Sequence, residues 1–137
     1  MRVERSHLFD SAEGLRLKAG KGRGGYIRNV TMVDVTMDGM RNAFMYNCNY
    51  GEHPAGANLS ALPHVSDIRA ANVRGTSCAR VADLEGIAEL PMHGITFDSV
   101  HFDGGDYKCS AVSGVYNDMS PTPCDEIAPA RAKISAV

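Results

Sequence analysis

The stretch IRNVTMVDVTM, residues 27–37, recurs twice along the chain, as VSDIRAANVRG at residues 65–75 and as MHGITFDSVHF at residues 92–102. The copies share the order and spacing of their apolar residues, so Val30, Ile68 and Ile95 are equivalent, at offsets of 38 and 27 residues. Short runs that alternate apolar and polar positions and are rich in Val, Ile, Thr and Phe are typical of half-buried strands. A degenerate fourth copy opens the chain at an offset of 29, where Met1, Val3, Ser6 and Leu8 match Val30, Met32, Val35 and Met37.

A second short strand is expected about 13 or 14 residues after the equivalent positions Met1, Val30 and Ile68, in GLRLK around Leu15, NAFMY around Phe44 and ARVADLEG around Val81. Units of this length that hold two or three short strands cannot bury a face alone, and they stack into a solenoid. The sequence therefore predicts an all-β fold, a parallel β-helix of about four coils over residues 1–108. The alternative is an antiparallel sandwich, but only Asp38-Gly39 and Asp103-Gly104 supply the hairpin turns that it needs.

The composition is that of one ordinary globular domain. The chain has 137 residues, 44% of them hydrophobic and 22% charged, with a net charge of −2. No apolar run approaches the roughly 20 residues that span a bilayer, so no membrane partner is expected. The first ten residues, MRVERSHLFD, lack the apolar core of an export signal, and the chain as given is expected to stay in the cytosol.

Four cysteines lack the paired C-x-x-C spacing of a zinc site, so no metal is expected. No cofactor is expected either. Cys109 and Cys124 enclose a stretch rich in Ser, Pro and Asn. A disulfide between them would close residues 109–124 as a C-terminal loop and add about 3 kcal/mol of stability in an oxidising compartment. Cys48 and Cys78 are expected to be small buried side chains. Residues 125–137 have weak patterning and are expected to form a loose tail.

A local basic patch stands out in this slightly acidic chain, in GLRLKAGKGRGGYIRN at residues 14–29. Arg16 and Lys18 lie two apart and are expected on one strand face, while Lys21, Arg23 and Arg28 follow in a Gly-rich corner. Such a cluster attracts an anion, although a merely solvated face is the plainer alternative. The order of a P-loop is missing, and one neighbouring aromatic makes a weak case for nucleic acid, which is not expected as a partner.

Several motifs follow one another along the chain: GLRLKAGKGRGGYIRNVTMVDVTM, NYGEHP, ALPHVSDIRAANVRGT and the Cys109 to Cys124 loop. Over about residues 1–126 they resemble the C-terminal part of plant-type polygalacturonases of glycoside hydrolase family 28. The resemblance implies a right-handed single-stranded parallel β-helix, like that of pectin lyases, and inverting hydrolysis of α-1,4-linked galacturonan, the acidic backbone of pectin. It also implies that Arg16 and Lys18 bind a galacturonate carboxylate and that Tyr50 packs against a sugar ring.

The catalytic motifs of that family do not occur among these residues. An inverting glycosidase needs one carboxylic acid and one carboxylate, which the family carries on an Asn-Thr-Asp segment and an Asp-Asp pair, near a Gly-His-Gly segment. Asp10 and His93 match none of the three and are interpreted as structural. The chain is therefore expected to be inactive by itself, as a C-terminal portion that lacks the general acid and base. The alternative is a non-catalytic module or pseudoenzyme that binds acidic polysaccharide.

Two further expectations concern the surroundings of the chain. Asn29 and Asn58 begin N-glycosylation tripeptides and fit a parent enzyme secreted to the cell wall. A β-helix cut on its N-terminal side would expose an apolar cross-section and unpaired strand edges, so self-association through the first coil is expected.

Overall fold

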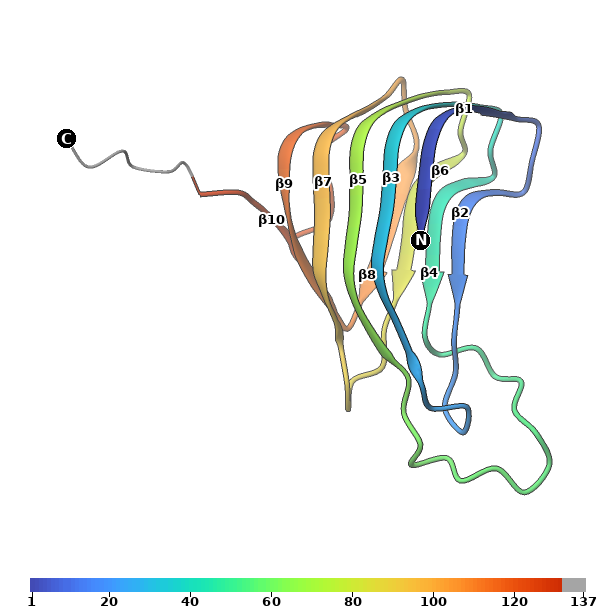
Figure 1. Ribbon diagram of the computed structural model, residues 1–137. Coiled ribbons are helices and arrows are strands. Elements are labelled where there is room, and N and C mark those ends of the chain that lie inside the picture. Colours follow the sequence, from blue (N-terminus) through green and yellow to red (C-terminus); the bar gives the residue numbers. More distant parts are fainter. Residues whose placement is uncertain (132–137) are drawn as a thin grey trace.

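The computed structural model describes residues 1–131 as two parallel β-sheets (Figure 1). One sheet has six strands in the order β1-β3-β5-β7-β9-β10, and the other has four in the order β2-β4-β6-β8. Residues 1–131 contain no helix long and apolar enough to cross a bilayer. The strands are β1 (Arg2–Phe9), β2 (Glu13–Lys18), β3 (Tyr26–Asp38), β4 (Asn42–Asn47), β5 (His64–Thr76), β6 (Arg80–Glu85), β7 (Met92–Phe102), β8 (Asp106–Ser110), β9 (Val112–Ser120) and β10 (Ile127–Pro129).

The chain alternates between the two sheets, because each of the first four coils gives one strand to the larger sheet and the next strand to the smaller one. All the strand pairs are parallel, and the register follows the sequence repeat: Val30 is paired with Ile68, and Ile68 with Ile95. The degenerate first copy is in register too, with Val3 opposite Met32. The predicted all-β parallel β-helix is therefore confirmed, and the sandwich alternative is wrong.

Each long strand of the larger sheet contains a residue with a positive φ value at an equivalent position of the strand register. In β3 the buried positions are two apart at Val30 and Met32, and then three apart at Met32 and Val35. The extra residue, Asp34, has a φ of 57°, and Asn72 at the equivalent place in β5 has a φ of 49°. Asp and Asn are among the L-residues that tolerate this left-handed conformation best. After the extra residue, the apolar side chains of the strand again point into the core. The Asn72 Nδ2 donates a 2.7 Å hydrogen bond to the Asp34 Oδ1, which links neighbouring coils.

The core lies between the two sheets and is built from the inward positions of both. Phe44 on β4 is fully buried, and its ring centroid lies 5.2 Å from that of Phe97 and 6.1 Å from that of Phe102. Burying an aromatic side chain of this size contributes about 1.5–3 kcal/mol. Tyr46 is also fully buried, and its hydroxyl has no hydrogen-bond partner within residues 1–131. Cys48 and Cys78 are free thiols in the core, as expected.

The C-terminal segment is more regular than the sequence indicates. Residues 109–124, expected as a loop, contain β9, which pairs with β7 along most of its length. The expected tail begins with β10, where Ile127 is buried, and residues 132–137 lie outside the described part of the chain. The sequence does not indicate β9 because this strand carries small and polar residues at most positions, with Val112 and Met119 as its buried side chains.

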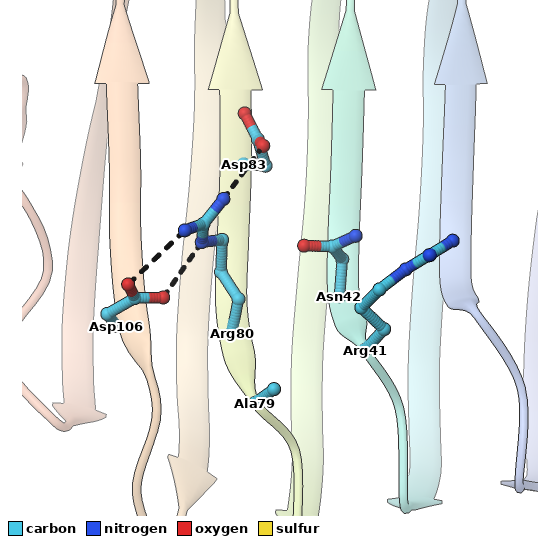
Figure 2. Close-up of a pocket in the computed structure, with 6 residues that line it drawn as sticks. All are labelled: Arg41, Asn42, Ala79, Arg80, Asp83 and Asp106. Atoms are coloured by element: carbon cyan, nitrogen blue, oxygen red, sulfur yellow. Dashed lines mark hydrogen bonds and ion pairs between the residues drawn. The ribbon is translucent and has the colours of Figure 1, made fainter.

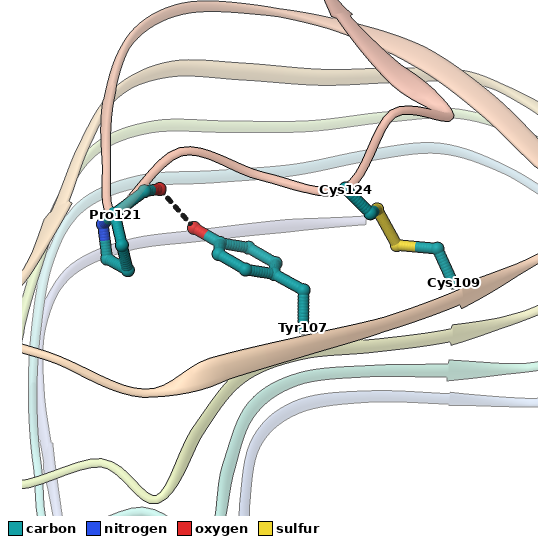
Figure 3. Close-up of a disulfide and its surroundings, with 4 residues drawn as sticks. All are labelled: Tyr107, Cys109, Pro121 and Cys124. Atoms are coloured by element: carbon teal, nitrogen blue, oxygen red, sulfur yellow. Dashed lines mark hydrogen bonds between the residues drawn. A yellow bond between two sulfur atoms is a disulfide. The ribbon is translucent and has the colours of Figure 1, made fainter.

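The disulfide lies beside this added coil (Figure 3). Cys109 is the fourth residue of β8, and its bond to Cys124 ties β8 to the chain that follows β9. The hydroxyl of Tyr107 donates a 2.7 Å hydrogen bond to the carbonyl oxygen of Pro121 in the same region, and burial raises the pKa of this tyrosine. Two contacts of different kinds therefore hold the C-terminal coil to the smaller sheet.

Candidate anion-binding site

The strand β2 presents its two cations to solvent. Leu15 and Leu17 are buried in the core, whereas the side chains of Arg16 and Lys18 are 42% and 41% exposed. Because successive side chains of a strand point to opposite faces, the two cations share the outer face of the smaller sheet. The placement expected from the alternation is observed.

The chain that follows β4 brings Tyr50 to the end of β2. The backbone N–H of Ala19 donates to the Asn47 carbonyl at 2.8 Å, and the N–H of Tyr50 donates to the Ala19 carbonyl at 3.1 Å. Gly20 is what allows this close approach, since a Cβ there would lie only 2.3 Å from the carbonyl oxygen of Tyr50. The two segments therefore continue side by side beyond the ends of their strands.

This arrangement places the Lys18 ammonium over the Tyr50 ring, 3.5 Å from the ring centroid. A cation over an aromatic face gains about 0.5–1 kcal/mol at an exposed site, which favours one orientation of both side chains. A sugar that packs on the same ring face has to displace the ammonium group, and a sugar on the opposite face leaves it in place.

Lys18 and Tyr50 line a shallow pocket of about 180 Å³ together with Ala19 and Arg23. Arg16, predicted to act with them, is not among the lining residues. Arg23 was noted in the sequence only as part of the basic patch, and nothing in the sequence marks it for the pocket. Its Nε donates a 2.9 Å hydrogen bond to the backbone carbonyl of Glu52, in the connection between β4 and β5.

The remaining charges of the basic patch differ in how they are neutralised. Lys21 forms a 2.7 Å ion pair with Glu89, and this hydrogen bond lowers the pKa of the glutamate. Arg16 lies 3.9 Å from a carboxylate oxygen of Glu13, a loose contact on the surface. Exposed pairs of this kind contribute about 0–1 kcal/mol. An anion from solution therefore competes with weak partners at Arg16.

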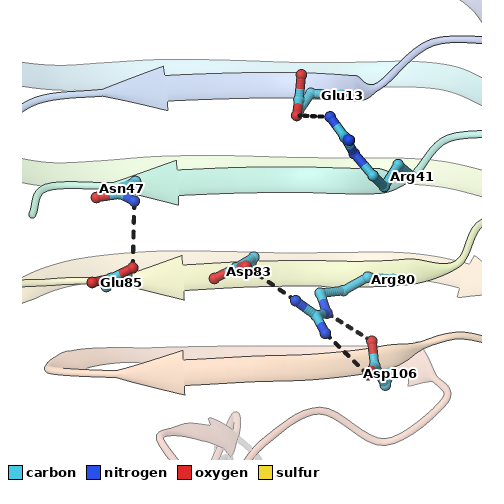
Figure 4. Close-up of polar contacts among 7 residues, drawn as sticks. All are labelled: Glu13, Arg41, Asn47, Arg80, Asp83, Glu85 and Asp106. Atoms are coloured by element: carbon cyan, nitrogen blue, oxygen red, sulfur yellow. Dashed lines mark hydrogen bonds and ion pairs between the residues drawn. The ribbon is translucent and has the colours of Figure 1, made fainter. Parts of the chain in front are cut away.

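A second pocket, of about 310 Å³, opens near the start of the strands of the same sheet (Figure 2). Its central cation is Arg80, which donates to Asp106 at 2.8 Å and to Asp83 at 3.1 Å. The hydrogen bonds with Asp106 raise the pKa of the arginine and lower that of the aspartate. Arg41, also in the lining, donates to Glu13 at 3.3 Å (Figure 4). The positive charges of this pocket are balanced by its own carboxylates. In the first pocket Lys18 has, among the described residues, only a loose 4.0 Å contact with the exposed carboxylate of Glu52, which makes the first pocket the better anion site.

Other residues singled out in the sequence lie apart from this pocket. Asp10 turns the chain between β1 and β2 with a φ of 46°, and His93 is exposed at the start of β7 with its Nε2 2.9 Å from that of His64. Asn29 and Asn58 are exposed, and the Asn58 Oδ1 accepts from the hydroxyl of Ser60 at 2.6 Å.

One grouping of possible metal ligands is found in residues 1–131, formed by Cys109, Cys124 and Glu126. The two sulfur atoms are bonded to each other and offer no thiolate. The group therefore does not have the chemistry of a thiolate metal site.

Comparison with known proteins adds independent evidence. The family model of glycosyl hydrolases family 28 matches residues 1–122. A probable polygalacturonase of Vitis vinifera is 31% identical over 134 residues, which is 93% of this chain and 27% of the relative. A polygalacturonase of Malus domestica is 27% identical over 125 residues, covering 89% of this chain and 27% of the relative. A polygalacturonase of Persea americana is 32% identical over 83 residues, covering 58% of this chain and 18% of the relative.

The chain thus spans about a quarter of the length of the first two relatives. No solved structure matches it. The family match covers nine of the ten strands formed by residues 1–131, and its span includes β2 and the pocket with Lys18 and Tyr50. The chain belongs to family 28 of the glycosyl hydrolases.

Proposed function

We propose that these residues form the carboxylate-binding part of a polygalacturonase, a glycosidase that hydrolyses the α-1,4-galacturonan of pectin in the plant cell wall. The observation that carries the proposal is the outer face of β2, where Arg16 and Lys18 stand exposed and Lys18 lies over the ring of Tyr50. Galacturonan carries a carboxylate on every unesterified sugar, and Arg and Lys bind carboxylates by charge-assisted hydrogen bonds.

The names of the three relatives support this assignment, because each is called a polygalacturonase or a probable one. The proposed partner is therefore acidic polysaccharide, and the proposed location of the whole enzyme is the extracellular space. Nucleic acid is a less suitable polyanion for this face, because the aromatic group in the pocket is a single tyrosine.

Binding and hydrolysis are separate parts of the proposal. None of the Asn-Thr-Asp, Asp-Asp and Gly-His-Gly segments occurs among the 137 residues. Inverting hydrolysis requires two carboxyl groups about 6.5–9.5 Å apart, on opposite sides of the scissile bond. We therefore assign the catalytic carboxylates to residues other than these and expect this stretch to bind without cleaving. A non-catalytic polysaccharide-binding module predicts the same binding.

Calorimetric titration of the 137-residue chain with an unesterified galacturonate oligomer tests the binding half. We expect saturable binding that weakens at least tenfold in the double variant Arg16→Ala, Lys18→Ala. The matched control is Lys108→Ala on β8, an exposed lysine of the same sheet, paired with Asp83 of β6 in the strand register. Equal affinity of the wild type and the double variant would refute the assignment.

A reducing-end assay on polygalacturonate tests the other half. We expect no release of reducing ends by the pure chain. Clear hydrolysis would show that catalytic groups lie within these residues and would overturn our placement of the two carboxylates. Titration with single-stranded DNA of the same charge, at two salt concentrations, separates a general polyanion binder from a uronate binder.

A further inference from the structure

The pocket beside Tyr50 contains one cation whose role the function above leaves open. Arg23 is exposed and lines the pocket with Lys18. Within residues 1–131 it has no carboxylate partner, whereas Lys21 is paired with Glu89 and Arg28 lies over the ring of Tyr26. In that same described range its one side-chain hydrogen bond runs from Nε to the Glu52 carbonyl. The charge of Arg23 is therefore available to a ligand.

The backbone around Arg23 is held in place by the neighbouring connection. Its own N–H donates to the Gly20 carbonyl at 3.2 Å, which closes a tight turn. The N–H groups of Gly22 and Gly24, on either side, both donate to the carbonyl of Ala61, at 3.0 and 3.2 Å. Both glycines have positive φ values, of 84° and 58°, a conformation that glycine adopts without strain. The side chain is thus presented from a fixed backbone.

The hydrogen bond to Glu52 also orients the guanidinium group. It uses the Nε–H, so the terminal N–H groups remain for a planar acceptor such as a carboxylate, which they can bind in a bidentate manner. A donor that is already oriented loses less conformational freedom when the ligand binds. Lys18 adds a second positive charge to the same pocket, and its one carboxylate neighbour within residues 1–131, the exposed Glu52, is 4.0 Å away.

We propose that Arg23 is a specificity-determining residue that, with Lys18, binds an ionised uronate carboxylate and thereby selects unesterified over methyl-esterified galacturonan. This inference rests on the proposed function. A methyl ester has no negative charge, and one of its oxygens carries the methyl group. It therefore cannot accept hydrogen bonds from both terminal N–H groups of Arg23 and from the Lys18 ammonium group together. Removal of the Arg23 guanidinium group therefore lowers the affinity for the free acid more than the affinity for the ester.

The experiment titrates the chain with two galacturonate oligomers of the same length, one unesterified and one fully methyl-esterified. The wild type is expected to prefer the free acid by at least tenfold. Arg23→Ala lowers affinity for the free acid about tenfold and leaves affinity for the ester nearly unchanged. Lys21→Ala is the matched control, since its cation is already paired with Glu89, and it keeps the wild-type preference.

Two further variants show whether the effect comes from the charge of Arg23 or from the shape of its side chain, and a stability measurement excludes unfolding as the cause. Arg23→Gln keeps a donor for the Glu52 carbonyl without the charge, and thermal unfolding of each variant shows that the fold is retained. Arg23→Gln is expected to lose the preference for the free acid, and Arg23→Lys to keep only part of it. An unchanged preference in Arg23→Gln, or an equal loss of affinity for both oligomers in Arg23→Ala, would overturn the inference.

The variant Lys18→Ala distinguishes the two levels of the argument. If Lys18→Ala weakens binding and the Arg23 variants do not, the role given to Arg23 is wrong and the proposed function stands. If the wild type binds neither oligomer, the proposed function itself fails.

Discussion

The substitution Gly20→Ala tests how the pocket is built. An alanine Cβ at this position would lie 2.3 Å from the carbonyl oxygen of Tyr50, about 1 Å inside the ordinary contact range, which begins at 3.4 Å. Both groups are fixed to the backbone, so no rotation of a side chain relieves the contact. The segments around Ala19 and Tyr50 have to separate, which strains the 3.1 Å hydrogen bond from Tyr50 N–H to the Ala19 carbonyl.

The expected effects follow from that separation. Overpacking of this kind costs about 1–3 kcal/mol, and for a domain of this size each kcal/mol lowers the melting temperature by roughly 4 °C. Tyr50 also moves away from the Lys18 ammonium, and the turn that presents Arg23 loses its fit to Gly20. We expect affinity for an unesterified galacturonate oligomer to fall at least about tenfold, which corresponds to 1.4 kcal/mol.

Thermal unfolding and calorimetric titration of the same preparations provide the measurement. Gly51→Ala is the matched control, because it adds the same methyl group next to Tyr50 with nothing within 4 Å. It is expected to keep the wild-type melting temperature and affinity. If Gly20→Ala behaves like Gly51→Ala in both assays, the close approach of the two segments does not build the pocket and the reasoning is refuted.

Three other predictions concern stability. Tyr46→Phe removes a buried hydroxyl that has no hydrogen-bond partner in the described part of the chain, so the free energy of unfolding is expected to rise by about 1 kcal/mol in urea denaturation; a fall would reveal a partner for this group. Reduction of the bond between Cys109 and Cys124 is expected to lower the free energy of unfolding by about 3 kcal/mol, and a Cys109→Ser, Cys124→Ser variant should match the reduced protein and not respond to reductant. Burial raises the pKa of Cys48 from 9.0 to about 11, so the unfolded state releases its proton first and stability is expected to fall as the pH rises from about 9 towards 11. The free energy of unfolding should fall less steeply between pH 9 and 10 in Cys48→Ala than in the wild type. An identical slope in both proteins would show that the Cys48 thiol does not cause the fall.

The sequence predicts the stacked coils because their apolar positions repeat. Val30, Ile68 and Ile95 could be aligned without any structure, and the observed strand register pairs the same residues. The fifth coil, which begins with β9, cannot be predicted in this way because its apolar positions do not repeat. In β9 only Val112 and Met119 are buried, which is too few apolar positions to reveal a period, and pairing with β7 determines the strand instead.

The candidate pocket was predictable only in part. The alternation in β2 places Arg16 and Lys18 on one face, and the family resemblance adds Tyr50. The role that we propose for Arg23 depends on the carbonyl of Glu52, a backbone atom in a connection without periodic sequence. The two residues are 29 positions apart and the acceptor is a main-chain atom, so the order of side chains in the sequence does not indicate this contact. Residues brought together by such connections become visible only in three dimensions.

The unequal length of the coils has a consequence for how this family can vary. Val30 and Ile68 are 38 residues apart and Ile68 and Ile95 only 27, yet all three stack in one column. Much of the additional chain lies in the connection between β4 and β5, which includes Glu52 and Ala61, the residues that hold the turn around Arg23. Coils of unequal length therefore keep the same stacking of Val30, Ile68 and Ile95. Evolution can therefore reshape the rim that we propose to meet the polymer, and with it the proposed preference for one form of pectin, while the stacked interior stays under its original packing constraints.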